Sequence, residues 1–404
     1  MNLSTERNKS LLSQKSRWEK VRLIDVCQID PSKKELNGID KNAEVSFGMM
    51  ADLGEHKKSF SPTQTKKMSE VEKGGYSYFK EQDVLLAKMT PCFENGKSGI
   101  ALNLKNGIGF GSTEFYVLRS NGKILSDWIY FVISSEKFLN EGKNSLVGTT
   151  GRRRLIKHYV ESFQIPLPSL PEQTKITELL QAVEAGIEQA EQQEKNLKEI
   201  RKSLINKLRR DKPKFGDLID GKCKNVTVGG IATEISQRVD NPSKSVYEKF
   251  VGLEDFETGE LSINKHSSTE NLVSAMKLFK NGDVLFARRN VYLKRVSQVA
   301  FDGVCSGDAI VMRTNEKEIL HEFLILVLNT SDFWDYALSN AAGAFSKRIK
   351  WRDLAMYSFD LPDIKTQEKV VDVFQLIETT IDQIKTQKQT LKNLKQKLLN
   401  EILG

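Results

Sequence analysis

Two stretches of the chain carry apolar residues in alternating steps of four and three, the spacing of a heptad seam along one side of a long helix. The sixth and eighth seam positions are charged instead: Glu194 and Arg201 in the first stretch, Lys388 and Lys395 in the second. The pattern predicts two helices of about 35 residues, each roughly 50 Å long. The apolar seam positions are Ile176, Leu180, Val183, Ile187, Ala190, Leu197, Leu204 and Leu208, then Val370, Phe374, Ile377, Ile381, Ile384, Leu391, Leu398 and Ile402.

The second stretch repeats the first. Leu167-Pro168 recurs 194 residues later as Leu361-Pro362, and the residues that follow align without a gap. The identities exceed what chance would leave, so the chain contains an internal duplication and is expected to bind something with two halves. The matched residues are Gln173, Lys175, Gln181, Glu184, Ile187, Gln189, Gln193, Leu197, Lys198, Leu204 and Asn206, and Gln367, Lys369, Gln375, Glu378, Ile381, Gln383, Gln387, Leu391, Lys392, Leu398 and Asn400.

The length of the two helices bears on how they pack. One such helix alone would be interpreted as an ordinary amphipathic helix on its own domain. Two matched helices are too long for ordinary domain cores, and pairing with each other buries both seams. The first helix delivers the chain to a second globular region within a few residues, so the second is expected to return antiparallel. A parallel pair would set Glu194 against Lys388, but one polar pair contributes little. We therefore predict an antiparallel coiled coil.

The rest of the chain is predicted to form two globular regions. Both contain short β-forming runs broken by Gly and Asn, such as Val84-Leu85-Leu86-Ala87 and Val284-Leu285-Phe286-Ala287, and their mutual likeness is confined to such islands. We predict an α+β fold with a pseudo-twofold internal repeat. The expected division is an N-terminal extension at 1–17, a first globular domain at 18–166, a first helix at 167–212, a second globular domain at 213–360 and a second helix at 361–404.

Composition narrows the class of protein. No run of about 18 apolar residues is present to span a bilayer, and the first residues lack the apolar core of a signal peptide, so a cytoplasmic protein is expected. The four cysteines and four histidines are scattered, so neither disulfides nor a metal site is predicted. A net charge of +8 is compatible with a polyanionic partner such as nucleic acid.

Most catalytic signatures are missing. Gly96-Lys97-Ser98 resembles the end of a phosphate-binding loop, but Pro91 stands where the first glycine is required. Asn241-Pro242 supplies half of the Asn-Pro-Pro-aromatic motif of an amino-methyltransferase, and no glycine-rich dinucleotide-type loop accompanies it. These two segments are therefore interpreted as turns.

The alternative function is a stand-alone nuclease of the PD-(D/E)xK type. Such an enzyme needs clustered carboxylates to hold a divalent metal and a lysine to steer the attacking water. Asp40, Glu55 and Lys57 have this outline, with Ile39 in place of the proline. Short patterns of this kind arise often by chance, so a solvated loop is the favoured interpretation.

Basic residues gather in polar loops at related points of both globular regions. Such loops suit phosphate clamping and hydrogen bonding to base edges, where bidentate Arg reads guanine and Asn reads adenine. Solubilising surface charge would explain one cluster, but recurrence in two divergent copies favours DNA binding. The candidate residues are Lys88, Thr90, Asn95, Lys97, Thr149, Arg152, Arg153 and Arg154 in the first region, and Arg288, Arg289, Asn290, Tyr292, Lys294, Arg295, Lys347, Arg348 and Lys350 in the second.

The order of these parts resembles the specificity subunit of type I restriction-modification systems, the HsdS family. Members of this family run target-recognition domain, long helix, target-recognition domain, long helix, and the resemblance covers nearly the entire chain. In this family a segment of the Leu-Pro and Glu-Gln type precedes each long helix, and such segments lie here at residues 167–173 and 361–367. The strand-ending Gly-Asp-Val-Leu-Phe-Ala-Arg segment is present at 282–288, and its counterpart at 82–88 departs slightly.

A second family-type segment is the Gly-Thr-Thr-Gly-Arg-Arg-Arg loop at residues 148–154, to which 342–348 is a looser match. The resemblance implies a non-catalytic subunit without a cofactor of its own. It would bind double-stranded DNA and two modification subunits, which carry S-adenosylmethionine and methylate adenine, and the assembly would recruit restriction subunits that use ATP and magnesium. Each target-recognition domain would read one half of a bipartite asymmetric site, and the helix pair would set the spacer.

Overall fold

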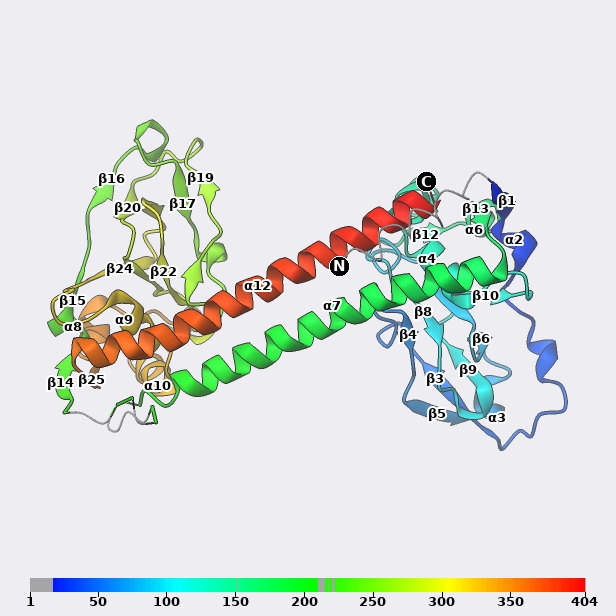
Figure 1. Ribbon diagram of the computed structural model, residues 1–404, viewed down its shortest axis with the longest axis horizontal. Coiled ribbons are helices and arrows are strands. Elements are labelled where there is room, and N and C mark those ends of the chain that lie inside the picture. The colour runs from blue at the N-terminus through cyan, green and yellow to red at the C-terminus, as the bar shows by residue number, and fades with distance from the viewer. Residues whose placement is uncertain (1–16, 150, 210–214, 217, 220–221, 404) are drawn as a thin grey trace. The chain divides into compact units, whose positions relative to one another are not determined.

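The computed structural model describes residues 17–149, 151–209, 215–216, 218–219 and 222–403 (Figure 1). Most of the expected N-terminal extension, and the predicted end of the first helix near residue 212, lie outside the described residues. The chain divides into two units, residues 1–190 with 387–404 and residues 191–386. Each unit contains one globular domain and a segment of both long helices.

The first domain is built on two sheets. One has five strands in the order β2-β10-β7-β8-β4, and the other has four in the order β5-β3-β9-β6. The strands and helices are β1 (Glu19–Arg22), α2 (Leu23–Val26), β2 (Cys27–Ile29), η2 (Lys33–Leu36), β3 (Glu44–Gly48), β4 (Ser59–Phe60), β5 (Gln64–Lys67), α3 (Met68–Val71), β6 (Ser77–Lys80), β7 (Val84–Ala87), β8 (Ser98–Ala101), η3 (Lys105–Gly107), β9 (Ile108–Gly111), β10 (Phe115–Ser120), α4 (Ser126–Ile133), α5 (Glu136–Lys143), β11 (Leu146–Val147), β12 (Arg154–Leu155), α6 (Lys157–Ser162) and β13 (Gln164–Leu167).

The second domain has the same strand plan with one additional strand, β16, at the edge of its second sheet. Its two five-stranded sheets have the orders β15-β24-β21-β22-β18 and β16-β20-β23-β17-β19. The strands and helices are β14 (Lys224–Thr227), α8 (Val228–Ile231), β15 (Ala232–Glu234), β16 (Arg238–Val239), η4 (Pro242–Lys244), β17 (Lys249–Val251), η5 (Leu253–Asp255), β18 (Ser262–Ile263), β19 (Ser267–Ser268), β20 (Met276–Phe279), β21 (Val284–Ala287), η6 (Val291–Leu293), β22 (Val296–Val299), β23 (Gly303–Cys305), β24 (Ala309–Thr314), α9 (His321–Val327), α10 (Ser331–Ser339), α11 (Trp351–Leu354) and β25 (Ser358–Leu361).

The two domains match in strand direction as well as in order. In the larger sheets, the parallel pair β4–β8 corresponds to the parallel pair β18–β22. In the second sheets, the parallel pair β3–β9 corresponds to β17–β23. The duplication inferred from the helices therefore extends through both domains, although outside short islands their sequences have diverged.

The apolar islands form the central strands. Val84 and Leu86 of β7 belong to one hydrophobic cluster, whereas Leu85 and Ala87 belong to another. In β21 the four residues Val284–Ala287 divide between two clusters in the same alternating way. A strand buried on both faces needs a continuous apolar run, which is why these segments kept similar sequences.

A buried carboxylate precedes each central strand. Asp83 accepts two hydrogen bonds from the guanidinium of Arg119, at 2.8 and 2.6 Å, and one from the backbone N–H of Lys80 at 2.7 Å. Asp283 accepts the equivalent bonds from Arg313, both at 2.8 Å, and from Lys280 N at 2.7 Å. The aspartate that recurs before the central strand of each domain therefore fixes the start of that strand.

The long helices are α7 (Leu170–Ile205) and α12 (Ile364–Leu403). Each is tied to its domain by a glutamine with no exposed surface. Gln173 accepts from Leu125 N (2.8 Å) and donates to the carbonyls of Lys123 and Pro168. This contact explains why the repeat retains glutamine near the start of the helix.

The second helix is attached in the same way. Gln367 accepts from Leu320 N (3.0 Å) and donates to the carbonyls of Glu318 and Pro362. Leu208, the last predicted seam residue of the first helix, lies beyond α7 but remains buried in the core of the second domain.

The helix segments pair in the first unit through seam residues and one ion pair. Ile176, Leu180 and Val183 of α7 share a hydrophobic cluster with Leu398 and Ile402 of α12. The ammonium of Lys395 lies 2.6 Å from Oε1 of Glu184, and both side chains are mostly buried. Early residues of α7 thus contact late residues of α12.

In the second unit, late residues of α7 contact early residues of α12. Ile205 shares a hydrophobic cluster with Val370 and Phe374. Arg201, which is 4% exposed, places its Nη1 2.7 Å from Oε1 of Glu378. The two helices therefore run antiparallel, and the arrangement predicted from the connectivity is confirmed.

One of the two charged seam positions in each helix now has an explanation. A shift of 194 residues converts Glu184 into Glu378 and Arg201 into Lys395, so the two ion pairs are copies of one another. A lone buried cation would be strongly unfavourable, whereas a paired one is tolerated. The second interruption of the apolar seam, at Arg201 and Lys395, is therefore the cation of this repeated pair.

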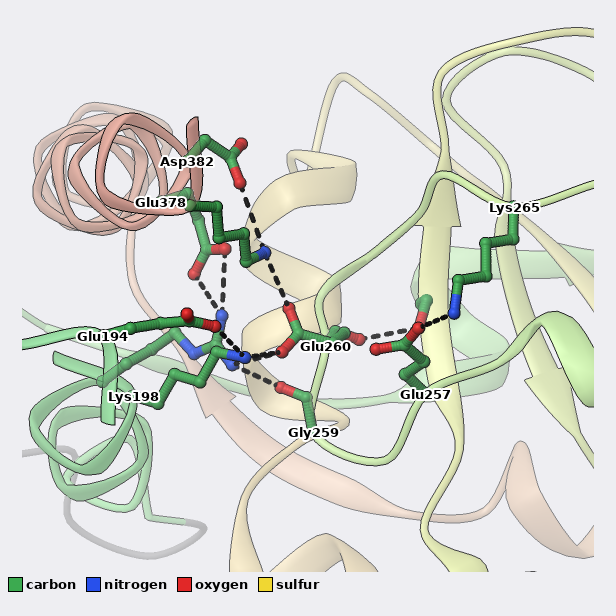
Figure 2. Close-up of polar contacts among 11 residues, drawn as sticks. Glu194, Lys198, Glu257, Gly259, Glu260, Lys265, Glu378 and Asp382 are labelled. Atoms are coloured by element: carbon green, nitrogen blue, oxygen red, sulfur yellow. Dashed lines mark hydrogen bonds and ion pairs between the residues drawn. The ribbon is translucent and has the colours of Figure 1, made fainter. Parts of the chain in front are cut away.

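A loop of the second domain joins the polar contacts of the helix segments in its own unit (Figure 2). The carboxylate of Glu260 lies 2.8 Å from Nζ of Lys198 on α7 and 3.8 Å from Nζ of Lys385 on α12. Arg201 donates to the carbonyl of Gly259 at 2.7 Å. Burial alone would raise the pKa of Glu260, but Lys198, Arg201 and Lys385 together hold it below its usual range. The loop therefore docks the domain on both helices by charge.

In the part of the chain that the structure describes, neither the long helices nor the shorter ones combine the length and hydrophobicity that a bilayer crossing requires.

Candidate nucleic-acid interface

Two basic loops lie together in the first domain. The β7 loop (residues 88–97) follows strand β7, and the β11–β12 loop (residues 148–153) lies more than 50 residues later. Thr90 N donates to the carbonyl of Arg153 at 2.9 Å, and Leu155 N donates to that of Lys88 at 2.8 Å. Lys88 N in turn donates to the carbonyl of Glu114 at 2.8 Å. Backbone hydrogen bonds therefore join loops that are distant in the sequence.

The same frame recurs in the second domain. Its β21 loop (residues 288–295) follows β21, and its partner is the 342–348 hairpin. Ile349 N donates to the carbonyl of Arg288 at 3.2 Å, and Val291 N donates to that of Lys347 at 3.4 Å. Arg288 N donates to the carbonyl of Asp308 at 3.0 Å. In each domain, the basic segments singled out in the sequence are brought into one cluster.

An acidic residue lies at the centre of each cluster. Arg154 makes two hydrogen bonds to Glu114, at 2.9 and 2.6 Å. The hydrogen bond from Arg154 is the main reason why the pKa of Glu114 is lowered, and partial burial opposes it. Sequence reasoning missed Glu114, although its position just before the strand β10 (Phe115–Ser120) recurs in the second copy.

The second-domain counterpart of Glu114 is Asp308, 194 residues later. Asp308 lies 3.2 Å from Nη2 of Arg348, 3.6 Å from Nε of Arg288 and 3.8 Å from Nη1 of Arg289. One carboxylate thus faces three guanidinium groups and holds them at the surface. Such an excess of positive charge around a single anion suits binding of further phosphate groups.

Part of the predicted DNA-binding set is exposed. The side chains of Arg154, Arg289 and Arg348 are 63%, 47% and 50% exposed, so their guanidinium groups remain accessible although each faces an acid. An exposed guanidinium can exchange an internal carboxylate for a phosphate or a guanine edge. The other exposed members of the set are Asn95, Thr149, Arg152, Tyr292, Lys347 and Lys350.

Other members of the predicted first-domain set hold the loops in place. Thr90 is 5% exposed and its Oγ1 accepts from Arg153 N at 3.1 Å. Lys88 lies over the ring of Tyr116, 4.6 Å from its centroid, and burial lowers the pKa of this lysine. Lys97 donates to the carbonyl of Met50 at 3.2 Å. Asn95, although exposed, donates to Glu55 at 3.0 Å, and Arg153 donates to Glu94 at 3.0 Å.

In the second domain, Asn290 and Lys294 adopt left-handed backbone conformations, with φ of 54° and 50°. Asn290 Oδ1 accepts from the hydroxyl of Ser346 at 3.0 Å, which ties the β21 loop to the 342–348 hairpin. Arg295 donates to the carbonyl of Leu253 at 2.6 Å. Composition alone could not separate such positioning residues from exposed ones, because both roles use the same polar side chains.

The residues of the nuclease alternative have local roles. Asp40 Oδ1 accepts from Asn42 N at 2.9 Å, which closes a turn. Glu55 accepts the hydrogen bond from Asn95 described above. Among the described residues, no group of three His, Cys, Asp or Glu side chains is placed to hold a metal ion.

Comparison with known proteins identifies relatives among the specificity subunits of type I restriction enzymes. A family model described as the type I restriction modification DNA specificity domain matches residues 15–199. The specificity subunits of the type I restriction enzymes EcoEI and EcoAI of Escherichia coli are each 32% identical to this chain over 192 residues. The aligned segment covers 47% of this chain and 32% of each relative, so the chain matches about a third of the length of these proteins.

A solved structure extends the likeness of the fold. It comes from a study of complex assembly and conformational transition of the type I R-M system, with a TM-score of 0.62 and 17% identity. The superposition covers 96% of this chain and 98% of that one. The arrangement of two sheet-containing domains and two long helices is therefore a known fold.

Proposed function

Because the chain belongs to the type I restriction-modification DNA specificity family, we propose that it reads a bipartite DNA sequence for a methylating and restricting complex. The observation that carries this proposal is the repeated pair of basic loops. Two domains with one strand plan present different side chains on the same hydrogen-bonded frame. One scaffold with two distinct surfaces suits a site whose halves differ in sequence.

Each domain would contact one half-site through its loop cluster. Exposed arginine and lysine side chains would bind phosphates and fix the register, and arginine, asparagine or threonine side chains would read base edges. The antiparallel helix pair, held by two copies of one ion pair, would set the unread spacer between the half-sites.

The chain itself would not catalyse a reaction and would need no cofactor. Methylation of adenine would be performed by two modification subunits that carry S-adenosylmethionine. Cleavage would require restriction subunits that use ATP and magnesium. The exposed polar faces of the long helices are the surface on which we place the modification subunits. The complex would act on chromosomal DNA in the cytoplasm.

The first test is methylation mapping. Expression of this chain with its modification subunits in a host free of other systems is expected to methylate adenine at one bipartite motif with two different halves. Methylation without a bipartite motif would contradict the proposal. The purified chain alone, given DNA and magnesium, is expected to leave the DNA intact, whereas cleavage would favour the nuclease alternative.

The second test assigns one domain to one half-site. Arg289→Ala removes an exposed guanidinium from the second domain and is expected to relax the motif in one half only, with a cost of about 1–3 kcal/mol if the contact is to a base. Arg152→Ala is the matched change in the first domain and should affect the other half. Equal weakening on all sequences would instead identify phosphate contacts.

A further inference from the structure

Phe345 is a fully exposed aromatic side chain at the tip of the 342–348 hairpin. Its relative exposure is 101%, the highest among the large apolar residues of the described chain. Exposed apolar residues are common on proteins when they lie singly on irregular loops. The loop that carries Phe345, however, is closed and fixed on both sides.

Backbone and side-chain bonds hold this hairpin. Ala342 N donates to the carbonyl of Arg348 at 2.9 Å, and Arg348 N donates back to that of Ala342 at 2.8 Å. Ser346, next to the tip, donates to Asn290 at 3.0 Å and accepts from Nε of Arg289 at 3.2 Å. The phenyl ring is therefore presented to solvent from a fixed position.

The first domain has a corresponding loop that is one residue longer and has a different tip. Val147 pairs with Arg154 there, as Ala342 pairs with Arg348 in the second domain. A glycine follows in each case, Gly148 with φ 123° and Gly343 with φ 119°, a backbone conformation that side chains disfavour. Between the glycine and the returning strand the first domain has Thr-Thr-Gly-Arg-Arg, whereas the second has Ala-Phe-Ser-Lys, so Thr-Thr-Gly stands where the second domain has Ala-Phe. The frame is common and the tip is specific to each domain.

The surroundings of Phe345 are cationic. Lys347 and Arg348 follow it in the hairpin, and Arg289 contacts its neighbour Ser346. An apolar partner protein surface would be poorly matched by this ring of positive charge. A DNA duplex matches both features, since phosphates accept the cations and the base stack accepts an aromatic ring.

We propose that Phe345 is a wedge that inserts between neighbouring base pairs in the half-site read by the second domain. The arginines and lysines around it hold the two phosphate backbones, and the ring enters the base stack between them. This deepens the function proposed above and rests on it. The first domain, whose loop tip is Thr-Thr-Gly, makes no such insertion, so the two half-sites are read by different means.

The test uses the complex of this chain with its modification subunits. The DNA is an unmethylated duplex that contains the motif identified by methylation mapping. 2-Aminopurine is placed at successive positions of each half-site, because its fluorescence rises when a base loses its stacking neighbour. The wild-type complex is expected to raise the fluorescence around each adenine that the modification subunits flip out for methylation. A wedge predicts one additional rise, at a step of the second half-site that lies apart from the methylated adenine and has no counterpart in the first half-site.

Phe345→Ala should abolish that rise and weaken specific binding about tenfold to a hundredfold, the range expected for loss of one stacked aromatic contact. The slope of affinity against salt concentration should stay unchanged, because no phosphate contact is removed. Phe345→Leu should keep most of the rise, since leucine also serves as a wedge. Val246→Ala is the control, because it truncates an 88% exposed side chain of the second domain that lies outside the two basic loops. It should change neither the fluorescence nor the affinity for the site.

Two outcomes would overturn the wedge. Phe345→Ala could bind the site as tightly as the wild type, with the same fluorescence pattern. Alternatively, it could lose the modification subunits during purification, which would make Phe345 a contact to protein. Failure of the wild-type complex to prefer its motif over random duplex would be a different result, because it would contradict the proposed function itself.

Discussion

The repeat is most informative at the buried glutamines. Gln173 and Gln367 each make three hydrogen bonds that join the first turn of a long helix to the preceding domain. Neither side chain has exposed surface. A buried amide of this kind cannot be replaced by an apolar side chain without leaving a backbone N–H and two carbonyls unpaired. The sequence showed that the glutamine was repeated, and the structure shows what it holds.

Gln367→Ala is therefore expected to lower the free energy of unfolding by about 2–4 kcal/mol, since it removes three partners at once and leaves a cavity. Gln383→Ala is the matched control, because this glutamine lies on an exposed face of the same helix and should cost less than about 0.5 kcal/mol. Chemical denaturation followed by circular dichroism measures both. Equal costs for the two variants would contradict the anchoring role of Gln367.

At the scale of the helices, the duplicated ion pairs set the register. Glu184 faces Lys395, and its copy Glu378 faces Arg201, so each helix contributes one acid and one base. An antiparallel pair related by a pseudo-twofold axis must repeat every contact in this reciprocal way. A slip by one heptad would leave four charges without partners, which disfavours other registers.

Glu184→Lys should place two ammonium groups together on the seam and destabilise the helix pair by about 2–3 kcal/mol. The exchanged double variant, Glu184→Lys with Lys395→Glu, should recover most of this loss because the pair is restored with reversed polarity. Thermal unfolding of the single and double variants measures the coupling. Additive losses in the double variant would mean that the two residues are not partners.

The charge contacts of Glu260 predict that the stability of the fold depends on pH. Because the pKa of Glu260 in the folded chain lies below the value of 4.5 for a free side chain, its charge stabilises the fold above about pH 4.5, and this contribution is lost as the pH falls through the lowered pKa. Glu260→Gln should therefore be less stable than the wild type by about 1 kcal/mol at pH 7, and the difference should shrink below pH 4.5.

Unfolding midpoints measured from pH 7 to pH 3 test this dependence. Glu257→Gln is the control, since Glu257 lies in the same loop with a side chain that is 53% exposed and pairs with the exposed Lys265. Its effect is expected to be small at every pH. A wild-type advantage over Glu260→Gln that grew on acidification would contradict the sign of the shift.

The elements differ in how far the sequence could predict them. The long helices were predictable because a heptad spans many residues and was present twice. Their orientation followed from the short connection between α7 and the second domain. The sheet order was not predictable, since strands such as β4 and β18 have two residues each and pair in parallel with distant segments. Loop positions were predicted as clusters, but the roles of Glu114 and Asp308 depend on contacts that no local pattern encodes.

At the scale of the whole molecule, the duplication separated two tasks. The strand plan, the anchoring glutamines and the seam ion pairs are retained in both copies, whereas the loop tips have diverged to Thr-Thr-Gly and Ala-Phe. Retained parts determine where the domains are held, and diverged parts determine what each domain contacts. If the helix pair sets the spacer, helix length and base recognition should be separable by mutation.

Removal of residues 188–194 from α7 together with 382–388 from α12 tests this separation. The deletion takes out corresponding heptads and leaves both ion pairs in register. It brings Leu197 to three positions after Ile187 and Leu391 to three positions after Ile381, so the heptad spacing continues across each junction. Seven residues shorten a helix by about 10 Å and are close to two full turns, so each domain retains its orientation about the helix axis. The spacer should become about three base pairs shorter, at about 3.4 Å per base pair.

Methylation mapping of the shortened protein measures the result. Both half-site sequences are expected to be unchanged, because no residue of the loop clusters is altered. Removal of the heptad from α7 alone serves as the control, since it separates Glu184 from Lys395 or Arg201 from Glu378 and should abolish methylation. A doubly shortened protein that still methylated sites with the original spacer would show that the helices do not measure it, and that the modification subunits hold the two half-sites apart instead.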